Sequence, residues 1–244
     1  MFILANYHLL RLDLSIALAT GTKPLLVPEH NISWKLYLIS SNTDFPRIPI
    51  DTLYSSSDSR LLNVWADLRE IAKAANVSSY SKDLHSPSFF QEALISVQYR
   101  LQNLAYESPD EQEILRLAML AFSSTIFFDC SNPFHKYENL ALRLRTALEL
   151  SERNFNDEWL RFIVWLIIVM KPLVPDGSCD YPWLLMQLSG AISGLGIKDW
   201  AELKQILESF LWVDMLESDF GAETLRNSVM NAKLPLVHRD STRK

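Results

Sequence analysis

The sequence predicts an all-α protein, a single multi-helix domain of about nine mostly antiparallel helices, and three observations lead to this prediction. Apolar residues recur every three or four positions along most of the chain, which is the spacing of one helix face. Proline after serine or asparagine opens several of these segments, as it does at helix N-termini. Regularly spaced short apolar runs, which would indicate strands, are missing from the sequence. We therefore expect one helical domain over residues 1–232 and a short polar tail over residues 233–244.

The first half of the chain is expected to hold five helices. The first is apolar and ends where Gly21 and Pro24 interrupt it. The third follows a serine-rich cap at residues 55–59 and carries the clearest amphipathic stripe. The fifth begins with Ser108-Pro109 and is apolar around most of its girth, so we expect it to lie buried at the centre. The predicted ranges are 6–20, 33–39, 58–76, 86–104 and 108–128.

The second half is expected to hold four further helices and a last one after Asp214. The segment 157–171 is rich in Val, Ile and Phe, so a buried strand is the alternative there. A helix is favoured because its large apolar residues fall on one helical face and because the segment exceeds the usual strand length. Asp199 is the expected N-cap of the fourth of these helices, with Glu202 completing a capping box. The predicted starts are Asn132-Pro133, Asn156, Asp180 and Asp199.

The most distinctive phrase of the sequence is Phe-Leu-Trp-Val-Asp at residues 210–214. Phe210 and Leu211 continue the apolar spacing that begins at Trp200, so we expect the helix to run through them. Trp212 is expected to anchor the core, and Asp214 is expected to cap the next helix. Trp200, Phe210, Trp212 and Asp214 are therefore candidates for a structural role and not for a catalytic one.

Charge and cysteine content argue against several classes of protein. The formal net charge is −6, so the chain has no basic field that would attract nucleic-acid phosphates. With only Cys130 and Cys179, neither a disulfide framework nor a four-ligand zinc site is expected. The N-terminal segment lacks a basic start, and the apolar run 162–170 is too short to cross a bilayer. We therefore expect neither a signal peptide nor a membrane span.

The sequence offers no motif for catalysis, a cofactor or a metal. It contains no Gly-rich phosphate loop, no Gly-x-Ser-x-Gly and no His-Glu-x-x-His. Cys130 and His135 lie close together, but one such pair is at best half of a zinc site. Most carboxylates lie at expected helix starts, where they stabilise the helix dipole. We expect a protein that is not an enzyme; an all-α enzyme acting on an apolar metabolite is an alternative, and it would need carboxylates on inward helix faces.

Several phrases occur in an order that carries information. They are Arg-Leu-Asp-Leu at 11–14, Ala-Leu-Ala-Thr-Gly at 17–21, Pro-Leu-Leu at 24–26, Ser-Val-Gln-Tyr-Arg-Leu at 96–101, Glu-Ile-Leu-Arg-Leu-Ala-Met-Leu-Ala-Phe at 113–122, and Trp200 with the phrase at 210–214. In this order they resemble the fungal-specific transcription factor domain. That domain is the helical regulatory region that follows the DNA-binding zinc cluster in fungal six-cysteine regulators.

The resemblance implies a helical, nuclear regulatory domain that engages protein partners, associates with itself or binds a small inducer. The zinc-cluster module is not among the matching phrases, because two cysteines cannot ligate two zinc ions in the six-cysteine manner. We therefore expect no direct nucleic-acid binding by this chain, and we expect it to be a regulator truncated on its N-terminal side. A stand-alone helical protein-interaction scaffold without a transcriptional role is the alternative interpretation.

Overall fold

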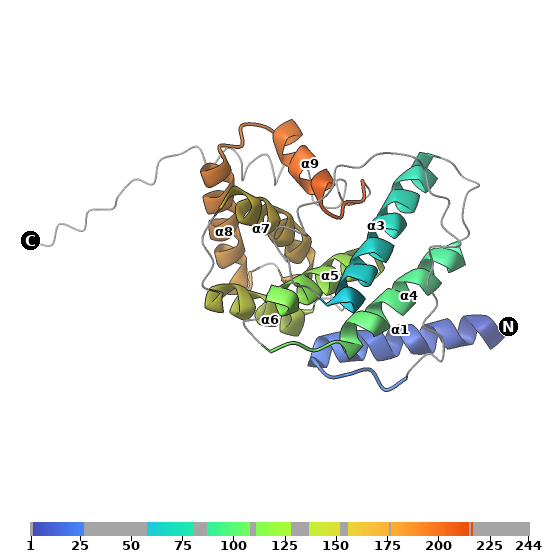
Figure 1. Cartoon of the computed structure of the whole chain (residues 1–244). Coiled ribbons are helices and arrows are strands. Elements are labelled where there is room, and N and C mark those ends of the chain that lie inside the picture. Colours follow the sequence, from blue (N-terminus) through green and yellow to red (C-terminus); the bar gives the residue numbers. More distant parts are fainter. Residues whose placement is uncertain are drawn as a thin grey trace, which may run out of the picture.

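Helices make up the regular structure of the part of the chain that can be described. The computed structural model describes residues 2–26, 58–80, 87–107, 111–127, 137–151, 156–175, 177–214 and 216. Within these ranges lie eight α-helices and one 3-10 helix, and no strand (Figure 1). They are α1 Phe2–Thr20, α3 Ser59–Tyr80, α4 Pro87–Asn103, α5 Glu111–Phe127, α6 Glu138–Leu150, α7 Asp157–Met170, η3 Lys171–Leu173, α8 Asp180–Leu195 and α9 Trp200–Ser209. The predicted all-α class is confirmed.

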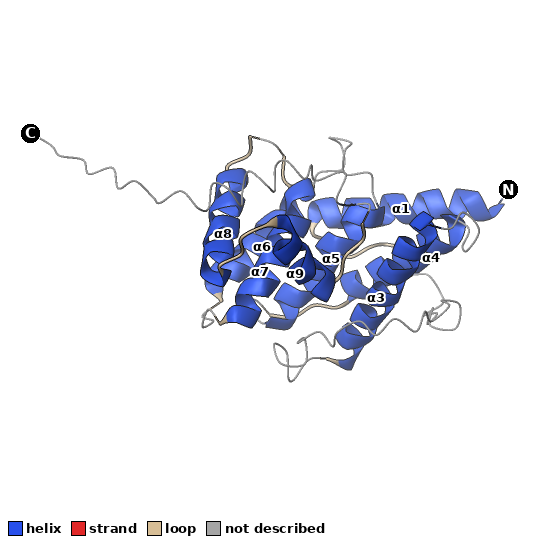
Figure 2. Ribbon diagram, turned by 90° about the horizontal axis from the view of Figure 1, so that it is seen from above, coloured by secondary structure: helices blue, strands red, loops and turns tan. Residues whose placement is uncertain are grey.

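Helix α5 lies at the centre of the domain, as its apolar girth predicted. It contacts α3 and α4 on one side and α6 and α7 on the other, and its residues from Glu113 to Thr125 are all buried. Helix α1 packs against α4 and α6, while α8 and α9 pack against α7. Seen from above, α1 and α8 therefore lie at opposite ends of one helical body (Figure 2).

The segment with the strand alternative is helix α7. Asn156 caps it, because its side-chain oxygen accepts a hydrogen bond from the Trp159 backbone N–H at 2.8 Å. Trp165, on α7, is fully buried and forms the centre of an aromatic cluster. Its ring meets Trp65 of α3 edge-on at 5.9 Å and stacks on Phe210 at 5.6 Å. This cluster fixes α3, α7 and the end of α9 relative to one another.

The predicted start of α6 at Asn132-Pro133 is wrong. The helix begins at Glu138, and Tyr137 occupies the N-cap position without a side-chain cap. Tyr137 has a non-helical backbone (φ −107°, ψ 67°) and a buried side chain, with its hydroxyl 3.3 Å from Ser15 Oγ of α1. Burial of this ring against α1 therefore sets the start of the helix, and the Asn-Pro pair does not.

Helix α8 is ended by a single glycine, and helix α9 ends earlier than predicted. Helix α8 continues through Gly190 and Gly194 to Leu195, and only Gly196, in the left-handed region at φ 65°, ends it. Helix α9 ends at Ser209, so Phe210 and Leu211 lie beyond it and not within it. The reason is tertiary: the indole N–H of Trp165 donates to the Leu211 carbonyl at 2.7 Å, which leaves that carbonyl outside a helical ladder.

Some predictions concern segments that the structure does not describe. The helix at 33–39, the Ser86 and Ser108-Pro109 starts, the helix after Asp214 and the tail 233–244 all lie outside the described residues. Among the helices that are described, none combines the length and the apolarity needed to cross a bilayer.

Candidate functional site

The four residues singled out in the sequence lie at the two ends of α9. Trp200 is the first residue of this helix and is half-buried, whereas Phe210 and Trp212 are each only 4% exposed. Asp214 is half-buried, with a carboxylate oxygen 3.7 Å from Lys204 Nζ of α9. The structure thus brings Phe210, Trp212 and Asp214 together in one extended segment that follows α9.

Asn76, on α3, holds this segment in place. Its amide nitrogen donates to the Trp212 carbonyl at 3.2 Å, and its amide oxygen accepts from the Asp214 backbone N–H at 2.8 Å. One side chain therefore satisfies an acceptor and a donor of a segment that has no helical partners of its own. Sequence patterning missed Asn76, because an asparagine near a helix end is more often a cap or a solvent-facing residue.

A hollow of about 280 Å³ lies between α3 and the 210–214 segment. Arg69, Lys73 and Asn76 line it from α3, and Trp212 and Asp214 line it from the opposite side. Lys73 pairs with Glu70 at 2.9 Å, so the wall on α3 is partly neutralised. This volume is close to the lower end of small-molecule sites, roughly 300–1,000 Å³. We call this hollow the α3–α9 groove.

A second junction forms around Asp13 of α1, which is buried. Its carboxylate accepts hydrogen bonds from the Leu25 and Leu26 backbone N–H groups at 2.9 and 2.8 Å and from the Tyr99 hydroxyl at 2.8 Å. Burial, together with the hydrogen bond to Asp13, raises the pKa of Tyr99 well above its usual value. The Tyr99 hydroxyl is therefore a fixed donor, and Asp13 joins α1, α4 and the turn after α1.

A third junction buries charge between α5, α4 and α6. Arg116 donates to the Glu113 carboxylate through Nε at 2.7 Å and Nη2 at 2.6 Å, and through Nη1 to the Leu101 carbonyl at 3.0 Å. Arg143 of α6 reaches the same carboxylate at 3.0 Å. Burying an ion pair costs free energy unless its hydrogen bonds are well satisfied, and a bidentate pair meets this requirement. Glu113 is therefore shared by two arginines.

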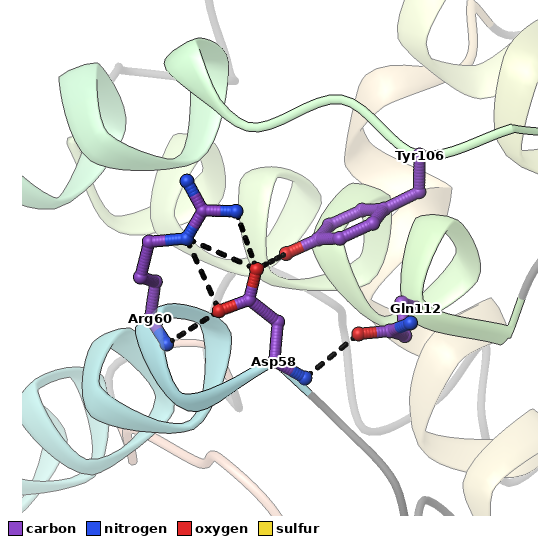
Figure 3. A network of polar contacts seen from close by, with 4 residues as sticks. All are labelled: Asp58, Arg60, Tyr106 and Gln112. Carbon is purple, nitrogen blue, oxygen red and sulfur yellow. Dashed lines mark hydrogen bonds and ion pairs between the residues drawn. The ribbon is translucent and has the colours of Figure 1, made fainter.

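The start of α3 is fixed by the network in Figure 3. Asp58 accepts from the Arg60 backbone N–H at 2.8 Å, as an N-cap does, and also from the Arg60 guanidinium at 2.6 Å and the Tyr106 hydroxyl at 3.1 Å. Its own backbone N–H donates to Gln112 Oε1 at 2.7 Å. Hydrogen bonding from Arg60 lowers the pKa of Asp58 to about 2, and burial raises the pKa of Tyr106 to about 12. Asp58 is therefore ionised near neutrality and is a steady acceptor at the start of α3.

A further hollow of about 420 Å³ lies between α6, α7 and α8. Trp159, Leu160 and Trp183 are among the residues that line it, and the Arg145 guanidinium lies 5.2 Å from the Trp183 ring. Its walls are largely apolar, with Glu149, Ser151 and Gln187 as their polar members.

The described residues form no candidate metal site. None of them forms a cluster of three or more His, Cys, Asp or Glu side chains suited to a metal ion. Cys179 is exposed, whereas Cys130 and His135 lie outside the described residues. This part of the chain offers hollows beside α9 and α8 and a set of polar junctions around α5.

Comparison with known proteins adds no relative to this picture. The chain matches no protein-family model, no curated protein and no solved structure. The resemblance to the fungal transcription factor domain therefore stays a prediction from the order of its phrases.

Proposed function

We propose that this chain is a non-enzymatic regulatory domain, related to the helical region of fungal zinc-cluster transcription factors. In this proposal it acts in the nucleus through protein partners or a small inducer, and a separate module binds the DNA. The observation that carries the proposal is that residues from several of the resembling phrases contact one another in the folded chain. Asp13, Leu25 and Tyr99 belong to three of those phrases and are joined by hydrogen bonds in the folded chain.

The other phrases support the proposal in the same way. The phrase 113–122 contains Glu113 and Arg116, the centre of the buried ionic junction. The phrase 210–214 supplies the Leu211 carbonyl to Trp165 and forms one wall of the α3–α9 groove. Some residues of these phrases are exposed, such as Leu12 and Leu25, so the support comes from the residues that make these contacts. These phrases hold the helices in register, which is the role expected of residues that define a fold.

The α3–α9 groove supplies a mechanism for regulation. Its two walls belong to α3 and to the segment after α9, and Asn76 makes two hydrogen bonds between them. A ligand or partner that contacts both walls favours the arrangement in which the Asn76 bonds are made, and so shifts the population of that arrangement. The ligand can change the free-energy difference between the two arrangements only by the difference between its binding free energies for them.

A tethered reporter assay tests this proposal. The chain is fused to an unrelated DNA-binding domain whose operator controls a reporter gene in a fungal host. We expect reporter activity to change relative to the DNA-binding domain alone, and we expect Asn76→Ala to alter that change. Arg145→Gln, on α6 and outside the lining of the groove, is the control. A fusion that leaves the reporter unaffected, or tight sequence-specific binding of the isolated chain in a DNA gel shift, would overturn the proposal.

One observation favours the second candidate, a helical protein-interaction scaffold. Leu9, Leu12 and Ile16 lie on the outer face of α1, and they are 56%, 57% and 52% exposed. Exposed apolar residues at this spacing form a stripe of the kind that docks another helix. Affinity purification separates the two candidates: recovery of transcriptional partners favours the regulator, and recovery of cytosolic, non-transcriptional partners alone favours the scaffold.

A further inference from the structure

A small pocket lies between α1, α4, α5 and α6, and polar and charged side chains form much of its lining. Its volume is about 120 Å³, and its polar lining comprises Thr22, Lys23, Gln102, Arg116 and Arg143. This volume is well below the roughly 300–1,000 Å³ of sites for drug-sized ligands, so the pocket suits a small molecule. We call it the arginine pocket.

The arginine pocket is cationic. Lys23, Arg116 and Arg143 line it, and Glu113 is the only described carboxylate that forms an ion pair with either arginine. Arg116 is buried, and its two bonds to Glu113 and one to Leu101 leave one N–H on each terminal nitrogen without a bond in the described structure. Positive charge therefore exceeds negative charge around this pocket, which favours an anion.

The pocket also carries an acceptor that lacks a donor. Gln102 is 8% exposed, and its Oε1 is fully buried without a hydrogen-bond partner among the described residues. Its amide nitrogen donates to Gln98 Oε1 at 3.4 Å, which is long for a hydrogen bond. A buried amide oxygen without a donor is rare in native proteins, so a water or a bound molecule that supplies a donor is expected here.

A second acceptor of the same kind lies at the edge of the pocket. Asn139 Oδ1 is buried and also has no partner among the described residues. It lies so close to Gly21, a lining residue, that a Cβ added there would be 2.6 Å away. Gly21 also has a φ of 72°, so two independent features keep a side chain out of this position. The close approach of α6 to the turn after α1 is thus preserved without filling the pocket.

We propose that the arginine pocket binds a small carboxylate with a hydroxyl or ammonium group on the adjacent carbon. The carboxylate lies against the free N–H groups of Arg116 and against Arg143 and Lys23, since charge-assisted hydrogen bonds to a carboxylate are the strongest such contacts available here. The donor on the next carbon satisfies Gln102 Oε1. Arg116 bonds the carbonyl of Leu101, the residue before Gln102, so its guanidinium and this acceptor lie on neighbouring parts of the same wall.

Three acids that differ in a single substituent test this chemistry. L-lactate, L-alanine and propionate carry a hydroxyl, an ammonium group and a hydrogen on the carbon next to the carboxylate. Each is titrated into the purified full chain at low ionic strength and followed by calorimetry. We expect lactate or alanine to bind at least about tenfold more tightly than propionate, because only these two supply the donor. Comparing lactate with alanine then shows whether the donor is neutral or charged.

Variants of the chain locate the binding. Arg143 is partly exposed, so Arg143→Gln is expected to fold and to weaken binding at least about tenfold. Arg145→Gln is the matched control, because it removes the same charge from the same helix but breaks contacts to Glu149 and Asp180 instead. Gln102→Leu is expected to make lactate, alanine and propionate bind alike. Circular dichroism melts verify that each variant is folded.

The proposal is overturned if none of the three acids binds, which would mean that the pocket holds only water. It is equally overturned if propionate binds as tightly as the other two, or if Arg143→Gln and Arg145→Gln behave alike. The idea that this pocket receives an inducer rests on the proposed regulatory function. The idea that it binds a small carboxylate does not depend on that function. Calorimetry can fail while the reporter assay succeeds, and the reverse also holds, so the two proposals fail separately.

Discussion

Replacing Trp212 by alanine tests whether the segment after α9 belongs to the core. Trp212 is 4% exposed, and its carbonyl is held by Asn76 of α3. Truncating a buried Trp to Ala removes its transfer free energy and leaves a cavity, at a cost of about 3–5 kcal/mol. Since native domains are stable by roughly 5–15 kcal/mol, this single change removes a large fraction of the free energy of unfolding.

The expected result is a large loss in thermal stability. For a chain of 244 residues, each kcal/mol shifts the melting temperature by roughly 2–4 °C, so Trp212→Ala should lower it by about 6–20 °C. Trp212→Phe keeps most of the apolar area and should lose less than half as much. The assay is a circular dichroism melt, with urea unfolding to convert the shift into a free energy.

Trp200→Ala is the control, because it makes the same chemical change at the other end of α9. Trp200 is only half-buried at the first helical position, so its loss should cost about 1–2 kcal/mol. If Trp212→Ala shifts the melt no more than Trp200→Ala does, Trp212 is not a core residue in solution. It would then be a surface residue available to a partner, and the packing described for this segment would be refuted.

Three further predictions concern other parts of the structure. Asp58→Asn keeps an N-cap oxygen but loses the charge, and we expect about 1 kcal/mol lower stability at pH 7, since the exposed Arg60 is screened by solvent. Because the folded pKa of Asp58 is lowered to about 2, its contribution to the free energy of unfolding is complete above pH 4 and disappears as the pH falls to 2. Urea unfolding across this range should therefore show the stability difference between wild type and Asp58→Asn becoming smaller. A difference that stays constant would contradict the ion pair. Asp13→Ala leaves three donors without their acceptor and should cost about 3 kcal/mol in urea unfolding, whereas Tyr99→Phe removes one bond and should cost about 1 kcal/mol; equal losses would show that Tyr99 carries the junction. Leu12→Ser, on the exposed face of α1, should change stability by less than about 0.5 kcal/mol yet reduce recovery of partners by affinity purification, and a large loss of stability would mean that this face is covered.

The candidate site was only partly predictable from the sequence. Trp212 and Phe210 were expected in the core, and their burial agrees with their apolar spacing. Asn76 and Asp13 were not foreseen as junction residues, because their partners lie far along the chain: Asn76 bonds Trp212 across 136 residues and Asp13 bonds Tyr99 across 86. No local pattern carries such a pairing. Only a polar residue on an apolar helix face gave a signal that could have been followed, as at Asp13, three residues after Leu10 and four before Ala17.

The sequence by itself determined the class, the central position of α5, the helical state of α7 and the caps at Asn156 and Asp199, where the Asp199 side chain accepts from the Glu202 backbone N–H at 3.0 Å. These features follow from residue spacing and from side chains that bond their own backbone, and both act within a few residues. The tertiary structure decided where α6 and α9 begin or end, because burial of Tyr137 and the hydrogen-bond requirement of the Trp165 indole outweigh local helix preference. It also placed Arg116 and Arg143 on one carboxylate, that of Glu113, beside the arginine pocket. This pocket exists only once the four helices that line it have packed.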